Sequence, residues 1–293
     1  MSIASPLKLT DVQQDAHKKI ISWANRAIEN RRYSEFVLGG LAGVGKSVLI
    51  NEVVATLIGM GHHIIVCAPS AKAGEVLKQK GIPENIVCTI HRLIYRFAGL
   101  RDNDYTEEQE PIFQDTGLFS ENFGKPDLII LDEASLCDGR EHDALSSRDV
   151  PILYVGDPGQ LPPVHRDPGI MNRMNIFLDK VLRQAEGSPI ISLAHKIRNG
   201  GAIEKSDADG EIIKVARCDN DALARCYVER GYDTVISARN KTRILINKKI
   251  RKFMGRDDVV VVGDRLIANN DNIVPAHKLP DLLVDQDPRL VSG

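Results

Sequence analysis

A glycine-rich segment, residues 40–47, carries the clearest chemical pattern in the chain. It reads G-x-x-x-x-G-K-S, follows the apolar run 36–38 and precedes the apolar-spaced segment 48–54. This is the pattern of a phosphate-binding loop between a strand and a helix, where backbone N–H groups and the helix terminus face a polyphosphate. We expect Lys46 to reach the β- and γ-phosphates and the Ser47 hydroxyl to bind Mg²⁺, which predicts ATP and Mg²⁺ as cofactors. The loop residues expected to bind nucleotide are Gly40, Ala42, Gly43, Val44, Gly45, Lys46 and Ser47.

Two carboxylates, Asp132 and Glu133, follow directly after the apolar run 128–131. Open α/β sheets bind ligands at the carboxyl ends of their parallel strands. Asp132 fits the acid that holds Mg²⁺ in P-loop nucleotide hydrolases, and Glu133 fits a general base for the attacking water. An isolated Asp-Glu pair is also common at a solvated strand end. The glycine-rich loop upstream favours the catalytic interpretation.

A third polar segment, residues 156–164, reads GDPGQLPPV and follows the apolar run 152–155. A glutamine at such a strand end, here Gln160, can touch the γ-phosphate or its water and signal hydrolysis to neighbouring loops. By itself the segment would be a proline-rich loop. Its position after the other two motifs makes it specific.

The elements that must position these groups are apolar runs alternating with helical segments. Strands are predicted at 36–38, 64–68, 86–89, 128–131 and 152–155, and helices from 9–14 onward, at 48–54, at 71–80 and from 91 to 97. Continuously apolar strands that alternate with helices indicate an α/β fold with a parallel sheet covered on both faces. A second α/β unit is predicted after Arg183, with helices at 189–198 and 244–253, strands at 234–237 and 259–264, and a poorly ordered tail from Asn269.

The composition narrows the classes to which the protein can belong. The 293 residues carry a net charge of −2, so a nucleic-acid surface would have to be a local patch. The five cysteines are widely spaced without a C-x-x-C pair, which is typical of free thiols and not of a disulfide or zinc framework. No apolar stretch has membrane-spanning length and the N-terminus lacks a signal-peptide pattern, so the sequence favours a cytoplasmic location.

The order of motifs resembles that of a known family. The motifs are L-T-x-x-Q at 9–13, the loop at 40–47, A-P-S-A-K at 68–72, T-I-H at 89–91, L-D-E-A-S at 131–135 and the segment 156–164. This order is similar to that of superfamily-one DNA helicases of the 5′→3′ branch, nearest to the RecD-like group and the phage Dda type. The segments 188–191 and 197–200 strengthen the phage-type match, and the resemblance covers most of residues 9–265.

The resemblance implies a fold and a set of roles. It implies a P-loop, RecA-like domain over residues 1–180 and a second, incomplete RecA-like domain over 181–293. It implies that Gln13 reads the adenine, that Gln160 couples nucleotide state to DNA, and that Arg183 reaches the γ-phosphate from the second domain. Without the resemblance, Arg183 would be interpreted as a surface arginine.

The resemblance also implies contacts with single-stranded DNA. The residues that match the family's DNA-binding loops are Pro69, Ser70, Lys72, Thr89 and His91. Hydroxyl and ammonium groups can hold phosphates, and an imidazole can stack on a base. Taken singly, each of these residues is more often structural. The acidic and aromatic insertion at 99–125 occupies the place of the family's strand-separating pin, although a solvated hairpin or loop fits it nearly as well.

Two family motifs of the second domain are missing from this sequence. One is a Thr-x-His-Lys-x-Gln-Gly segment that contacts DNA, and the other ends in Thr-Arg and supplies a second γ-phosphate arginine. The pair His277-Lys278 precedes Leu279 and Pro280, so it is not the first of them. The chain is similar to a helicase that stops partway through its second motor domain, which a shortened chain, a split gene or a degenerate protein would explain. The expected partners are therefore single-stranded DNA and a protein that supplies the missing motifs or belongs to the replication machinery.

Two functional hypotheses remain. The first is an ATP-dependent 5′→3′ DNA helicase, or part of one, acting in replication, recombination or repair in a bacterial or phage-infected cell. The second is an ATP-binding regulatory or accessory subunit without motor activity of its own. A P-loop kinase of a small molecule is a third interpretation, but it does not explain the segments 156–164 and 89–91.

Overall fold

The computed structural model describes residues 9–102, 109–115, 117–179, 189–202, 219–256 and Val261. The chain divides into two compact units, Met1–Glu204 and Lys205–Gly293. The boundary expected between residues 180 and 181 falls in the segment 180–188, outside the described residues, and stays a prediction. Within the described residues, no helix is both long and apolar enough to cross a membrane.

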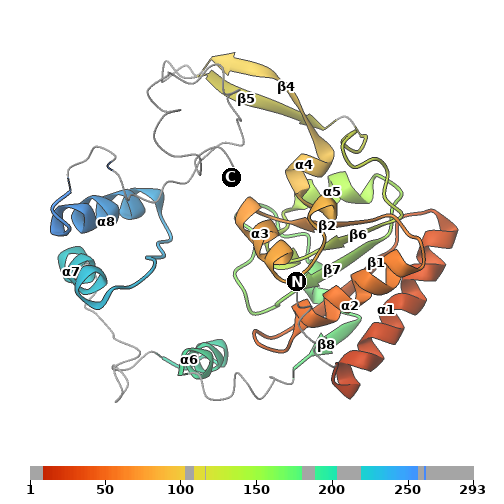
Figure 1. Ribbon diagram of the computed structural model, residues 1–293, viewed down its shortest axis with the longest axis horizontal. Helices are drawn as coiled ribbons and strands as arrows, with labels where there is room; N and C mark the ends of the chain where they lie inside the picture. The colour runs from red at the N-terminus through yellow and green to blue at the C-terminus, as the bar shows by residue number, and fades with distance from the viewer. Residues whose placement is uncertain are drawn as a thin grey trace, which may run out of the picture. The chain divides into compact units, whose positions relative to one another are not determined.

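A six-stranded sheet forms the centre of the first unit, with strand order β3-β2-β6-β7-β1-β8 (Figure 1). Its strands are β1 (Glu35–Gly40), β2 (Ile64–Ala68), β3 (Val87–Thr89), β6 (Leu128–Leu131), β7 (Ile152–Gly156) and β8 (Ile176–Leu178). Every paired neighbour runs parallel. All residues of β2, β6 and β7 are buried, as expected for strands covered on both faces. The predicted parallel α/β fold is confirmed, whereas β8 was not predicted.

Helices surround this sheet and connect its strands. They are α1 (Asp11–Asn30), α2 (Lys46–Gly59), α3 (Ala71–Gln79), α4 (Ile90–Ile94) and α5 (Gly139–Ser146), with short 3₁₀ turns at Glu84–Ile86, Ala134–Leu136 and Ile170–Asn172. A further helix, α6 (Pro189–Arg198), comes after the last strand of the sheet. Thr10 caps α1, and its side chain and that of Gln13 form a reciprocal capping box. The buried stripe Ala16, Ile20 and Ala24 on α1 joins the core, and α1 packs on α2 (Figure 1). α2 ends at Gly59, five residues beyond the predicted helical segment 48–54.

The helix predicted from 91 to 97 is wrong beyond Ile94. Residues Tyr95–Asp102 form a strand, β4, that pairs antiparallel with β5 (Gln109–Asp115), and Figure 1 shows this hairpin continuing from α4. The apolar residues at 93, 94, 95 and 97 fit one turn of helix, but pairing with β5 decides the conformation of the second half. The hairpin covers part of the predicted insertion at 99–125 and begins before it.

A buried arginine holds the two ends of this hairpin. The Arg148 side chain is 1% exposed and forms an ion pair with Asp115. One guanidinium nitrogen, Nη2, also donates to the carbonyl oxygens of Ile94, at 3.2 Å, and Leu118, at 3.4 Å. Arg148 thus binds the residue before β4, the last residue of β5 and the chain beyond it.

The described part of the second unit consists of two packed helices, α7 (Asn220–Arg230) and α8 (Asn240–Phe253). A small apolar cluster joins them through Ala224, Ile246 and Ile250. The predicted strand at 234–237 is wrong: these residues are irregular and Ile236 is 92% exposed, because no described strand lies there for them to pair with. Apart from Val261, the predicted strand at 259–264 lies outside the described residues, as does the tail from Asn269, so the second RecA-like domain stays a prediction.

Candidate active site

The motifs found in the sequence follow strands that end at one edge of the sheet. Residues 41–45 follow β1, Asp132 and Glu133 follow β6, and the segment 157–160 follows β7. Because all these strands are parallel, their carboxyl ends bring the three segments together. β7 lies between β1 and β6, so the segment 157–160 is placed between the phosphate loop and the acidic pair.

The phosphate loop has the backbone conformation that its glycines permit. Gly43 and Gly45 both have φ of +79°, in the left-handed region that other residues rarely adopt. A side chain at Gly40 would meet Val44 and the Leu178 backbone at 3.0–3.2 Å, so the loop packs closely against β8. Lys46 begins α2, and its ammonium donates to the carbonyl oxygens of Gly40 at 2.7 Å and Leu41 at 3.0 Å.

The charges of three acidic groups act on Lys46. Burial lowers the pKa of Lys46, while the charges of Asp157, Glu133 and Asp132 act to raise it. Asp157 has the largest effect of these acids, although no role was predicted for it. Its signal was the position directly after β7, the same kind of position that identified Asp132. The site therefore places a half-buried cation, which can attract the negative charge of a triphosphate, among three carboxylates.

Gln13 lies behind the phosphate loop with both ends of its amide engaged. Its Nε2 donates to the carbonyl oxygens of Val44 at 3.1 Å and Gly45 at 3.4 Å, and its Oε1 accepts from the Thr10 backbone N–H at 2.9 Å. The side chain is buried, since the residue is 4% exposed. These contacts tie α1 to the loop. Recognition of adenine by Gln13 stays a prediction.

Ser47 and Asp132 are suited to hold Mg²⁺. A hydroxyl and a carboxylate are the hard oxygen ligands that this ion prefers. Burial raises the pKa of Asp132, as does the neighbouring Glu133, whereas the Glu133 backbone N–H and the cations Lys80 and Lys46 act to lower it. A cation is already present in this region, because the Lys80 ammonium donates to Ser47 Oγ at 2.9 Å. The donor set therefore fits a divalent cation.

Glu133 and Gln160 are the residues predicted to act in hydrolysis. Glu133 has φ of 53° and ψ of 39°, a left-handed conformation that costs a residue with a side chain about 1–2 kcal/mol. Such strain is common at active sites, where the surrounding structure maintains it. The amide oxygen of Gln160 accepts a hydrogen bond from the Ser135 hydroxyl at 2.8 Å. Ser135 thus joins the segment after β6 to that after β7, a role that the sequence did not assign.

An ion pair connects α6 to the same loops. One guanidinium nitrogen of Arg198, the last residue of α6, donates to both carboxylate oxygens of Asp157 at 2.8 Å. Asp157 is 2% exposed, and its Oδ1 also accepts from the Gly159 backbone N–H at 2.8 Å. A side chain at Gly159 would come within 2.3 Å of the guanidinium, so a larger residue there would displace the end of the Arg198 side chain. Arg183, the arginine expected at the γ-phosphate, lies outside the described residues.

The residues expected to contact DNA follow β2 and β3, which are neighbours in the sheet. Ser70 and Thr89 cap α3 and α4, since their hydroxyls accept from backbone N–H groups at 3.2 Å. Lys72 is exposed in the first turn of α3, directly after Pro69 and Ser70. This edge is continuous with the nucleotide edge, because β2 pairs with β6.

Among the residues expected to contact DNA, His91 has the only aromatic side chain. Its side chain is 62% exposed, and its ring lies 5.1 Å from that of Tyr95. Its Nδ1 lies 3.6 Å from a carboxylate oxygen of Glu141. The imidazole is therefore accessible for stacking. Contacts between this edge and DNA stay predictions.

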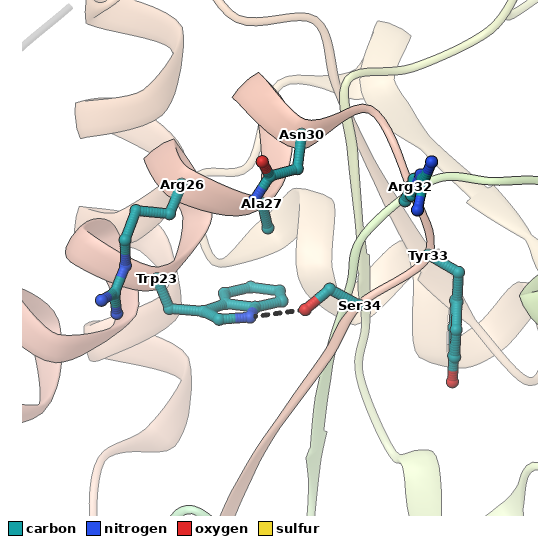
Figure 2. A pocket seen from close by; sticks show the side chains of 7 residues that line it. All are labelled: Trp23, Arg26, Ala27, Asn30, Arg32, Tyr33 and Ser34. Atoms are coloured by element: carbon teal, nitrogen blue, oxygen red, sulfur yellow. Dashed lines mark hydrogen bonds between the residues drawn. The ribbon is translucent and has the colours of Figure 1, made fainter.

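A separate pocket of about 650 Å³ lies where β1 begins. Trp23, Arg26, Ala27 and Asn30 line it from α1, and Arg32, Tyr33 and Ser34 line it from the segment before β1 (Figure 2). The Trp23 indole N–H donates to Ser34 Oγ at 3.0 Å, as Figure 2 shows. The phosphate loop follows the opposite end of β1, so this pocket is not part of the candidate active site.

Comparisons with known proteins agree with this geometry. A family model described as an AAA domain matches residues 10–217. The ATP-dependent RecD2 DNA helicase of Deinococcus radiodurans is 32% identical over 176 residues, which cover 57% of this chain and 22% of that protein. The ATP-dependent DNA helicase PIF1 of Saccharomyces cerevisiae is 23% identical over 229 residues, which cover 68% of this chain and 26% of that protein.

Among solved structures, the Pif1 helicase of Candida albicans is 17% identical and superposes with a TM-score of 0.41, covering 82% of this chain and 61% of that one. The chain spans about a quarter of the length of the RecD2 and PIF1 relatives. Its family model covers most of the first unit, including all three motifs at the sheet edge. The chain therefore belongs to the AAA domain family, and its motifs and relatives identify it as a RecD/Pif1-like member of superfamily one.

Proposed function

We propose that this chain is the ATP-hydrolysing part of a DNA helicase that moves 5′→3′ along single-stranded DNA. The observation that carries the proposal is the gathering of Lys46, Glu133 and Gln160 at one sheet edge, next to the strands that present the DNA candidates. If nucleotide and DNA bind at the same sheet edge, a structural change at one binding site can alter the other site.

In this proposal each group of the site has a distinct task. The loop amides and Lys46 bind the β- and γ-phosphates, and Glu133 accepts a proton from the attacking water. Ser47 and Asp132 hold Mg²⁺, which supplies positive charge to the phosphate oxygens when it is bound. Gln160 senses the γ-phosphate and passes this information to the acidic loop through its hydrogen bond with Ser135.

DNA would lie along the carboxyl ends of β2 and β3. The N–H groups at the start of α3 and the ammonium of Lys72 face a backbone phosphate there, and His91 offers an exposed ring to a base. Arg183, which the family resemblance assigns to the γ-phosphate, would add a further positive charge to the site. Arginines in this position are worth roughly 10³–10⁵ in rate in related nucleotide hydrolases.

A second candidate function is a nucleotide-dependent accessory subunit that requires a partner. In this candidate function, ATP binding is coupled to the partner and not to movement along DNA. The isolated chain would then bind ATP and turn it over slowly.

The test is the steady-state rate of ATP hydrolysis, measured with and without single-stranded DNA and beside the variant Lys46→Ala. Strong stimulation by DNA that the variant abolishes is the expected result. Nucleotide binding without stimulated hydrolysis would favour the accessory subunit. Phosphate transfer to a metabolite, without any effect of DNA, would reject both.

A further inference from the structure

One lysine outside the known motifs contacts an expected magnesium ligand. The Lys80 ammonium donates to Ser47 Oγ at 2.9 Å, and its charge also acts on the carboxylate of Asp132. Lys80 lies at the C-terminal cap of α3, so it comes from a part of the chain 33 residues away from Ser47. The two oxygens suited to a divalent cation therefore already interact with a cation of the protein itself.

A hydrogen bond from α2 holds the backbone of Lys80 in place. The Asn51 side-chain amide, one turn after Ser47 on α2, donates to the Lys80 carbonyl oxygen. Gly81 follows with φ of +99°, a left-handed conformation that glycine permits. The C-terminal end of α3 is thus attached to the first part of α2.

We propose that Lys80 is a tethered cation that competes with Mg²⁺ for Ser47 and Asp132 and so sets the metal requirement of nucleotide binding. This inference rests on the proposed nucleotide site but not on DNA unwinding. A divalent ion bound to Ser47 Oγ would lie beside the ammonium, and like charges that share one oxygen repel each other. Lys80 must therefore leave Ser47 when the metal binds, which raises the metal concentration that the site needs.

The helix that carries Lys80 also carries DNA candidates at its other end. Ser70 caps α3 and Lys72 lies in its first turn, whereas Lys80 caps its C-terminus. A shift of α3 on DNA binding would move the ammonium relative to Ser47. Competition by Lys80 thus gives the expected DNA edge a physical route to the metal ligands.

The test measures binding of a fluorescent ADP analogue over a series of Mg²⁺ concentrations and in EDTA. The variant Lys80→Gln removes the charge, Lys80→Arg keeps it, and Lys78→Gln on the same helix is the matched control with the same change in net charge. Because charges at an exposed site interact weakly but Mg²⁺ is doubly charged, we expect Lys80→Gln to lower the midpoint Mg²⁺ concentration roughly three- to tenfold. The midpoint Mg²⁺ concentrations of Lys80→Arg and Lys78→Gln are expected to stay near that of the wild type.

Two results would overturn the proposal. If Lys80→Gln weakens ADP binding equally in EDTA and in Mg²⁺, Lys80 binds a phosphate and does not compete with the metal. If the midpoint Mg²⁺ concentration is unchanged, Lys80 has no effect on metal binding. A failure of DNA to stimulate ATP hydrolysis would reject the helicase proposal and leave this measurement intact, because no DNA is present in it.

Discussion

Replacement of Arg148 by methionine tests how the β4–β5 hairpin is attached. The variant removes the ion pair with Asp115 and the hydrogen bonds to the Ile94 and Leu118 carbonyl oxygens. Removing one partner of a buried ion pair costs about 3–5 kcal/mol. The Asp115 side chain is 34% exposed, so water can solvate part of its charge. We therefore expect Arg148→Met to lower the free energy of unfolding by about 2–4 kcal/mol.

Urea unfolding at pH 7, followed by circular dichroism, measures this loss. Hydrogen exchange of the β4 and β5 amides should accelerate more than that of β6, since the hairpin loses its attachment while the sheet keeps its own. The exposed Arg140, replaced by methionine on α5, is the control and should change stability by less than about 0.5 kcal/mol. A loss below about 1 kcal/mol in Arg148→Met would refute the argument that this arginine holds the hairpin.

The pH dependence gives an independent check of the same pair. Partial burial acts to raise the pKa of Asp115, but hydrogen bonds from Arg148 and the Gly117 backbone, with the arginine charge, bring it below its usual value. A lowered pKa stabilises the fold above the unfolded pKa of about 3.9, and this contribution is lost as the pH falls through the folded pKa. The stability difference between wild type and Arg148→Met should therefore be full at pH 7 and shrink below about pH 4. A difference that stays constant into acid would contradict this assignment.

Two further predictions concern the nucleotide edge. Because the Gln13 amide supports the phosphate loop, Gln13→Ala should weaken ATP and GTP binding by the same factor, up to about tenfold, in equilibrium titrations; a loss confined to ATP would instead support recognition of adenine. Arg198→Gln should lower the free energy of unfolding by about 1–3 kcal/mol, because it leaves the buried Asp157 without its guanidinium partner. In a double-mutant cycle with Asp157→Asn the two losses should not add, and simple additivity would show that the ion pair contributes nothing.

The predictions that the structure confirmed depend on neighbours in sequence. The apolar run 64–68 coincides with β2, and the helical segment 48–54 lies within α2. The chemical motifs follow strands closely, so the sequence could place Lys46, Asp132 and Gln160 near strand ends. Each of these inferences uses residues a few positions apart, where backbone preference and side-chain pattern act together.

Where prediction failed, pairing with a distant segment decided the conformation. Residues 95–97 have an apolar pattern that suits a helix, yet they form a strand because they pair with β5. The segment 234–237 has the composition of a strand, but within the described residues no partner strand accompanies it. Propensity is a weak preference, and hydrogen bonding to a partner outweighs it.

The sequence by itself determined the phosphate loop, the acidic pair, the alternation of strands with helices and the family to which the motifs belong. Only the tertiary structure decided the strand order that inserts β7 between β1 and β6, the ion pair of Arg198 with Asp157 and the contact of Lys80 with Ser47. The physical reason is distance along the chain. A motif is read from adjacent residues, whereas these contacts join residues 33 and 41 positions apart, and they exist only after the sheet has assembled.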